Sequence, residues 1–373
     1  MIERLLKNRL IEKLDDKKVI VLLGARQVGK TTLLNSIFSQ KEQVQFLSGD
    51  DADTEALFRR ANATFFKKNF AQTKFLIIDE AQRIKDIGVK LKLMADHVPG
   101  VKVLVSGSSA FDLANKIQEP LTGRKWEYQL HPVSFAEMVN HHGLLEEKRL
   151  LQSRLLYGYY PEVVTNPGRE KEILKSLTDS FLYKDILQWE GIQKPQKLLT
   201  LLQALAYQVG HTVSFNELSI KVGLDKKTVE KYINLLEQTF VIFRMGSFSR
   251  NLRNELSNSS KYYFYDNGIR NALIAAFQPI ENRMDIGALW ENYMVAERKK
   301  YNDYNQQWCN TYFWRTHAQQ EIDLIEEKDG LLYAFEIKWN PAAKARLSKT
   351  FSSQYPNHQF AVINNENYTA FLM

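Results

Sequence analysis

The feature that most constrains the fold of this chain is a glycine-rich octapeptide near its N-terminus. Residues 24–31 read GARQVGKT and match G-x-x-x-x-G-K-[ST] at every fixed position. An apolar run at 18–23 precedes the octapeptide, and a helical pattern, TTLLNSIF, follows it at 31–38. A glycine-rich loop between a strand and a helix is typical of phosphate binding. The sequence therefore predicts an open α/β domain with a ligand site at this loop.

Each part of the octapeptide suits a nucleoside triphosphate. Glycines let the backbone wrap a phosphate with its N–H groups pointing inward, and the helix that follows adds the positive end of its dipole. Lys30 is expected to reach the β- and γ-phosphates, and the Thr31 hydroxyl to ligate Mg²⁺. The expected ligands are thus ATP and Mg²⁺. The expected binding residues are Gly24, Ala25, Arg26, Gln27, Val28, Gly29, Lys30, Thr31 and Thr32.

A second apolar run, at 75–78, ends in two carboxylates, Asp79 and Glu80. Ligands of open α/β sheets bind at the carboxyl ends of the strands. We expect Asp79 to hold Mg²⁺ and Glu80 to orient or deprotonate an attacking water. Further short apolar runs at 44–47 and 101–105, with helix-length segments between them, predict βαβ units and a buried parallel sheet.

Two further side chains are candidates for the same chemistry. Ser108, or its neighbour Ser106, follows the apolar run at 101–105 and is placed to hydrogen-bond a γ-phosphate or a water; the alternative is that Ser108 or Ser109 caps the next helix. Arg124 is a candidate arginine finger, acting in cis or in trans, and its alternative is a surface ion pair. A finger acting in trans would require a homo-oligomer.

The middle of the chain has the pattern of a helix-turn-helix. The S-x-x-E sequence from Ser214 to Glu217 is a capping box that opens a first helix. Gly223 breaks that helix, and Asp225 is placed to cap a second one, KKTVEKYINLLEQ. The strand-like segment at 240–248 would then form a wing.

The second of these helices begins with a basic surface. Lys226 and Lys227 open it and Lys231 follows, and in DNA-binding versions of this motif the N-terminal end of the second helix enters the major groove. Arg250 and Arg253 would add phosphate contacts from the wing. DNA is therefore a candidate partner, and a packing module with solvated lysines is the alternative.

The C-terminal region contains a predicted hairpin with opposed carboxylates. Asp329-Gly330 is a strong two-residue turn signal. The register set by that turn places Asp323 opposite Glu336 on one face, and Lys338 shares that face. Two opposed carboxylates repel one another unless a cation lies between them. In the alternative, Glu321 opposite Lys338 forms an ordinary ion pair.

Five segments occur together in one order, and they carry a resemblance. They are GARQVGKTTLL, FLIIDEAQRI, VLVSGSSAFDL, LTGRKWEYQLHPVSFAE and GYYPEVV. Together they resemble prokaryotic AAA-type P-loop ATPases with a C-terminal uncharacterised restriction-endonuclease-like domain. The resemblance implies an AAA-like core, a winged-helix middle and a nuclease-like end. Glu291 matches the acid that such folds place on their first helix. Together with Asp323, Glu336 and Lys338 it would form a nuclease-like site, in which carboxylate-bound Mg²⁺ activates water.

Composition excludes several classes of protein. Hydrophobic residues are 44% and charged residues 25% of the chain, as in an ordinary globular protein. Cys309 is the only cysteine, so no intrachain disulfide or cysteine-based zinc cluster is expected. No apolar run approaches the ~20 residues of a membrane span, and the N-terminus lacks a signal-peptide pattern, so a cytoplasmic location is expected. The chain has a net charge of +7, and its basic excess lies in residues 1–265, where a polyanionic partner is most plausible.

The sequence therefore predicts an α/β protein of three domains: an AAA-like ATPase core at 1–150, a helical region with a winged helix at 151–262, and a nuclease-like α/β domain at 263–373. The predicted function is ATP hydrolysis with Mg²⁺, coupled to nucleic-acid binding. Two alternatives stay open. One is a metal-dependent DNA nuclease regulated by ATP, and the other is a non-enzymatic nucleotide switch that binds a protein or DNA.

Overall fold

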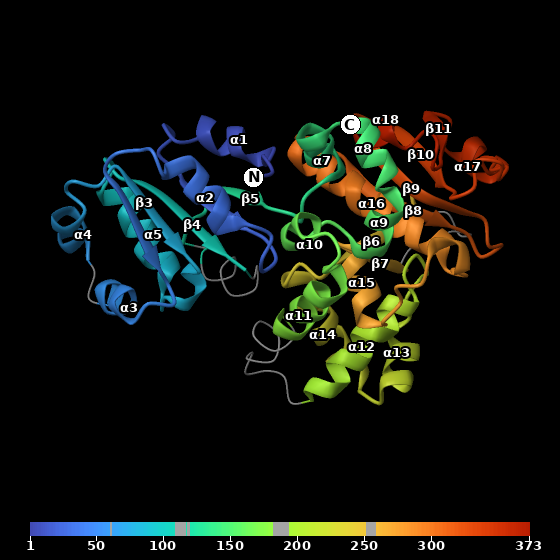
Figure 1. Cartoon of the computed structure of the whole chain (residues 1–373), viewed down its shortest axis with the longest axis horizontal. Coiled ribbons are helices and arrows are strands. Elements are labelled where there is room, and N and C mark those ends of the chain that lie inside the picture. Colours follow the sequence, from blue (N-terminus) through green and yellow to red (C-terminus); the bar gives the residue numbers. More distant parts are fainter. Residues whose placement is uncertain (60–61, 109–116, 118–119, 182–193, 251–258) are drawn as a thin grey trace. The chain divides into compact units, whose positions relative to one another are not determined.

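The computed structural model describes residues 1–59, 62–108, 117, 120–181, 194–250 and 259–373. The chain forms two compact units. Unit 1 comprises residues 1–132 with 238–240, and unit 2 comprises residues 133–237 and 241–373 (Figure 1). None of the described helices is both long enough and apolar enough to span a membrane.

Unit 1 is built on a five-stranded sheet with the order β2-β3-β4-β1-β5, in which every neighbouring pair is parallel. All residues of the central strands β1 and β4 are buried, as expected for a parallel sheet covered on both faces. The four predicted strands are confirmed, and β5 is a fifth that the sequence pattern did not reveal. The strands are β1 (Val19–Leu23), β2 (Val44–Ser48), β3 (Phe75–Asp79), β4 (Lys102–Gly107) and β5 (Lys125–Gln129).

Helices connect the strands of unit 1 as the βαβ pattern predicts. The helix after the octapeptide begins at Lys30, directly behind Gly29, which is left-handed with φ 94°. The helices are α1 (Leu6–Glu12), α2 (Lys30–Phe38), α3 (Ala52–Arg59), α4 (Ala63–Asn69) and α5 (Ile87–His97), with a 3₁₀ turn η1 (Ala81–Arg83). The loops that follow β1, β3 and β4 consequently lie at one edge of the sheet.

The first half of unit 2 is helical. Its helices are α7 (Phe135–His142), α8 (Leu144–Arg149), α9 (Leu151–Tyr157), α10 (Pro161–Thr165), α11 (Glu170–Phe181), α12 (Pro195–Tyr207), α13 (Phe215–Val222) and α14 (Lys226–Gln238). The two helices of the predicted helix-turn-helix are α13 and α14. Ser214 caps α13, Gly223 ends it with φ 68°, and the Asp225 carboxylate caps α14 by accepting from the Thr228 amide.

The second half of unit 2 contains a six-stranded mixed sheet with the order β11-β10-β9-β8-β6-β7. The remaining elements are β6 (Ile242–Ser247), β7 (Ser260–Phe264), α15 (Asn267–Leu273), η3 (Ile280–Asn282), α16 (Ile286–Tyr304), β8 (Asn310–Arg315), β9 (Glu321–Lys328), β10 (Leu331–Ile337), α17 (Lys349–Gln354), β11 (His358–Ile363) and α18 (Thr369–Leu372). The strand expected to be a wing is β6, which pairs with β7 and, in parallel, with β8. The predicted division near residue 262 falls within β7.

The predicted hairpin is confirmed in its register. Leu331 pairs with Lys328 and Phe335 with Leu324, on either side of a turn in which Asp329 and Gly330 both have positive φ. This is the backbone conformation that a two-residue turn of the Asp-Gly type requires. The pairing ends at Phe335 and Leu324; beyond it, the side chains of Asp323 and Glu336 both contact Lys338.

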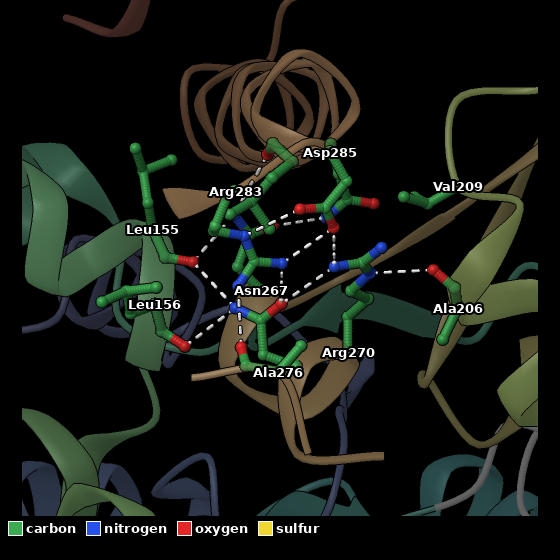
Figure 2. A network of polar contacts seen from close by, with 12 residues as sticks. Leu155, Leu156, Ala206, Val209, Asn267, Arg270, Ala276, Arg283 and Asp285 are labelled. Atoms are coloured by element: carbon green, nitrogen blue, oxygen red, sulfur yellow. Dashed lines mark hydrogen bonds and ion pairs between the residues drawn. The ribbon is translucent and has the colours of Figure 1, made fainter. Parts of the chain in front are cut away.

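A buried polar network fixes the start of α16, the longest helix among the described residues of unit 2. Figure 2 shows Arg270, on α15, and Arg283 pointing toward the same carboxylate, that of Asp285, which precedes α16. Arg270 also donates to the Ala206 carbonyl, and Arg283 to the Ala276 carbonyl. Because a buried guanidinium without acceptors is costly, these bonds define how α12, α15 and α16 pack together.

Candidate functional site

The glycine-rich loop of unit 1 lies close against Leu130, the residue directly after β5. A Cβ atom on Gly24, whose φ is 158°, would lie 2.2 Å from the carbonyl oxygen of Leu130. Gln27 and Gly29 have positive φ values of 61° and 94°. The loop therefore needs glycine at position 24 for close approach and at position 29 for its turn into α2.

The lysine of the octapeptide is held inside the loop. Its side-chain nitrogen donates to the carbonyl oxygens of Gly24 and Ala25, both at 2.9 Å. Lys30 is only 5% exposed. Its positive charge is thus placed at the centre of the loop, where a bound phosphate would need it.

Arg4 supports the loop from the N-terminal segment. One of its terminal nitrogens donates to the Val28 carbonyl at 2.7 Å, and the other to the His131 carbonyl at 2.6 Å. The side chain is buried. Arg4 has no motif or spacing that marks it in the sequence, and it is a functional candidate that sequence reasoning missed.

The ends of β3 and β4 meet the start of α2. The Thr31 hydroxyl donates to one oxygen of Asp79 at 2.6 Å, and the Ser106 hydroxyl donates to the other oxygen of the same carboxylate. The sheet order explains this contact, because β4 lies between β1 and β3. The predicted magnesium residues Thr31 and Asp79 are therefore adjacent.

Glu80 has a strained backbone and a held side chain. Its φ of 49° and ψ of 42° are left-handed, which is uncommon for a residue other than glycine and often accompanies function. The Gln82 amide donates to its carboxylate at 2.5 Å, and the Ser108 hydroxyl lies 3.3 Å from the same oxygen. A Cβ on Gly49 would lie 2.2 Å from the Glu80 carbonyl oxygen. Ser109, the alternative helix cap, lies outside the described residues.

Arg124 lies at the opposite edge of the sheet. Its carbonyl accepts from the amide of Val19, the first residue of β1, whereas the octapeptide follows the last residue of β1. Five strand residues at ~3.3 Å each separate the two edges by ~16 Å. The Arg124 side chain instead bonds Asp96 at 2.7 Å and holds the pKa of that carboxyl below its usual range. This position corrects the expectation of an arginine finger in cis, and a role in trans stays a prediction.

In unit 2 the structure brings the four residues of the predicted nuclease-like site to one place. Lys338 bonds Asp323 at 3.2 Å and Glu336 at 2.7 Å. Glu291, on α16, interacts electrostatically with Asp323. Two further residues join them: Glu321 and the buried Lys261. We call these six residues the carboxylate cluster.

Lys261 joins Glu291 to Glu321. Its nitrogen lies 3.0 Å from a Glu291 oxygen and 2.6 Å from a Glu321 oxygen. The Tyr263 hydroxyl donates to the same Glu291 oxygen at 2.6 Å. The alternative pairing of Glu321 with Lys338 is thus replaced by the pair with Lys261. Sequence reasoning missed Lys261 because it lies on β7, far along the chain from the hairpin.

Burial shifts the protonation of the carboxylate cluster. It raises the pKa of Glu336 to about 7, with the Asp323 charge adding to the shift. It also raises the pKa of Glu291 against the opposing charge of Lys261. Throughout the described part of the chain, no three His, Cys, Asp or Glu side chains are placed to share a metal ion.

The basic side chains of α14 are solvent-exposed. Lys226, Lys227 and Lys231 are all exposed, while Val229 and Tyr232 of the same helix are buried. Of the predicted wing arginines, Arg250 pairs with Glu327, and Arg253 lies outside the described residues.

A glycine-rich loop between β1 and α2, an Asp-Glu end of β3 and a parallel sheet of the order 2-3-4-1-5 define a P-loop domain. The family comparison agrees, since residues 16–139 match the model of an AAA domain. The N-terminal domain therefore has a P-loop fold and is similar to AAA domains. Residues 148–280 and 286–371 match two domains of unknown function, DUF8612 and DUF4143.

Similar proteins extend over most of the chain. An uncharacterised protein of Mycobacterium tuberculosis is 26% identical over 336 residues, which are 88% of this chain and 72% of that protein. One from Haemophilus influenzae is 26% identical over 369 residues, covering 89% and 86%. The structure of the Walker-type ATPase paby2304 of Pyrococcus abyssi aligns with 74% of this chain and 96% of its own, at 16% identity and a TM-score of 0.54, which shows a shared fold.

Replacing Arg4 with alanine should weaken nucleotide binding. The change leaves the buried Val28 and His131 carbonyls without this donor, at a cost of ~1–3 kcal/mol for each unsatisfied group. We expect a higher Kd for a fluorescent ATP analogue and a lower melting temperature. Lys7→Ala removes the same charge from the neighbouring helix α1 and should change neither. Equal affinities for Arg4→Ala and the wild type would show that Arg4 does not support the loop.

Proposed function

We propose that the N-terminal domain binds ATP together with Mg²⁺ and hydrolyses the ATP. The observation that carries this proposal is the convergence of Thr31 and Ser106 on the Asp79 carboxylate, beside a loop with a buried lysine. The ends of β3 and β4 meet the start of α2 there, at the edge where ligands of open α/β sheets bind.

The residues present fit a magnesium ion. Hydroxyl and carboxylate oxygens are the ligands that Mg²⁺ prefers, and Thr31 and Asp79 offer both within 2.6 Å of one another. When bound, Mg²⁺ neutralises charge that develops on the phosphates during transfer. Lys30 would bind the β- and γ-phosphates by its ammonium group, and the amides at the start of α2 would add further donors.

Glu80 would orient the attacking water and accept its proton. The hydrogen bond from Gln82 and the contact with Ser108 fix the direction of its carboxylate. A general base must be held within hydrogen-bond reach of the proton it removes. The left-handed backbone of Glu80 fixes the direction in which its side chain leaves the main chain.

Lys30→Ala should abolish ATP binding or hydrolysis. The change removes the ammonium group that the loop holds at the carbonyls of Gly24 and Ala25 and would offer to the phosphates. Isothermal titration with ATP and Mg²⁺, followed by a phosphate-release assay, measures both steps. Lys17→Ala, at an exposed position of the same unit, is the matched control. Turnover in Lys30→Ala at the wild-type rate would reject the assignment of the phosphate loop.

Glu80→Gln should preserve ATP binding and stop hydrolysis. The amide fills the same space but cannot accept a proton, and losing a general base costs ~10²–10⁴-fold in rate. Single-turnover hydrolysis and a binding titration separate the two effects, with Glu42→Gln as the exposed control. Unchanged turnover would place the base elsewhere. A wild type that binds ATP with no turnover at all would favour the non-enzymatic switch.

A second candidate function is DNA binding by the helical part of unit 2, in a winged-helix arrangement. The observation that favours it is the exposure of three lysines on the first two turns of α14, whose opposite face is buried. A helix with such a basic exposed face is suited to phosphate contacts, and those contacts are governed by salt.

If α14 contacts DNA, affinity should fall with rising salt, by ~0.9 in log K per log salt for each phosphate contacted. Replacing Lys226, Lys227 and Lys231 together by alanine should make this slope shallower. The matched control replaces three exposed lysines of α8 and α11, Lys148, Lys171 and Lys175. Fluorescence anisotropy with a labelled duplex measures the slopes. The DNA-binding role is rejected if the two triple variants behave alike.

A further inference from the structure

The carboxylate cluster already contains its own cations. Each of its four carboxylates lies within 3.2 Å of a lysine nitrogen. Lys261 forms ion pairs with Glu291 and Glu321, and Lys338 forms ion pairs with Asp323 and Glu336. The two ammonium groups supply the same positive charge that one divalent metal ion would bring.

Lys261 and Lys338 differ in their freedom to move. The Lys338 side chain is 36% exposed, whereas the Lys261 side chain is 1% exposed. Lys261 sits over the ring of Phe313, and its nitrogen lies between Glu291 and Glu321 from two different elements, α16 and β9. Burial acts to lower the pKa of Lys261, but the Glu291 and Glu321 charges outweigh burial and hold its pKa above the ordinary value. Lys261 therefore stays charged and fixed.

Among the described residues, the carboxylates of the cluster are not placed so that three of them could share one metal ion. One oxygen of Asp323 accepts from the Ile337 amide at 2.8 Å and also from Lys338. A cation placed near Glu291 would lie against the ammonium group of Lys261, a like charge. The observed donor geometry thus does not fit the metal site that a restriction-endonuclease-like fold implies, although the residue types do.

We propose that Lys261 is a built-in cation that takes the place of a divalent metal in the carboxylate cluster, so that this site binds no metal and cleaves no DNA while Lys261 is present. In this role Lys261 ties β7 to α16 and β9. The D…E-x-K pattern of Asp323, Glu336 and Lys338 is then part of an internal ion-pair network.

Manganese binding to the full-length chain, counted by electron paramagnetic resonance without nucleotide, tests the proposal. Wild type and Asp323→Asn should bind equal amounts of Mn²⁺, because the cluster of the wild type takes none. Lys261→Met should bind one Mn²⁺ more per chain than the wild type, and Lys261→Met with Asp323→Asn should lose it again. Ions held at Thr31 and Asp79 are common to all four chains and cancel in the comparison.

Two controls separate charge from packing. Lys261→Arg keeps the cation and should gain no Mn²⁺. Lys300→Met removes an equally buried lysine, which bonds the single carboxylate of Glu297 at 2.6 Å, and should gain none either. Mn²⁺ bound by the wild type and lost in Asp323→Asn would overturn the proposal, even if Lys261→Met fails to fold. A folded Lys261→Met without the extra ion would overturn it as well, and so would divalent-dependent nicking of DNA that the wild type performs and Asp323→Asn does not.

Discussion

A charged side chain buried away from water needs opposite charge or backbone carbonyls around it, because an isolated buried ion is far less stable than a solvated one. Both units of this protein are arranged around that constraint. Lys30 sits among the carbonyls of the phosphate loop, and Arg4 joins that loop to the strand end beside it. Arg270 and Arg283 share Asp285, and Lys261 joins two carboxylates.

The two units surround their buried lysines with different kinds of partner. In unit 1 Lys30 donates to neutral carbonyls of the glycine-rich loop, at the place proposed for a bound phosphate. In unit 2 the partners of Lys261 are the carboxylates of Glu291 and Glu321, which neutralise its charge within the protein. The same residue type therefore marks a ligand site in one unit and, by our proposal, a closed ion-pair network in the other.

The family match and the geometry of the candidate site concern the same part of the chain, the N-terminal domain. The match to an AAA domain covers residues 16–139, which contain the phosphate loop, the Asp-Glu pair, and Ser106 and Ser108 at the end of β4. The parallel sheet explains why these segments act together, since the carboxyl ends of parallel strands lie at one edge. The C-terminal match, to a domain of unknown function, leaves the carboxylate cluster to be explained by its own contacts.

The sequence by itself determined the features that depend on local order along the chain. The octapeptide, the strand ending in Asp79 and Glu80, the caps of α13 and α14 and the register of the Asp329-Gly330 hairpin all follow from residue types at fixed spacings. Only the tertiary structure decided what lies opposite them. Arg4, Gly49 and Lys261 come from distant segments with no motif, and the parallel pairing of β5 with β1 places Arg124 at the far edge of the sheet. Contacts between segments far apart in the chain depend on how the elements pack, and no spacing along the sequence encodes them.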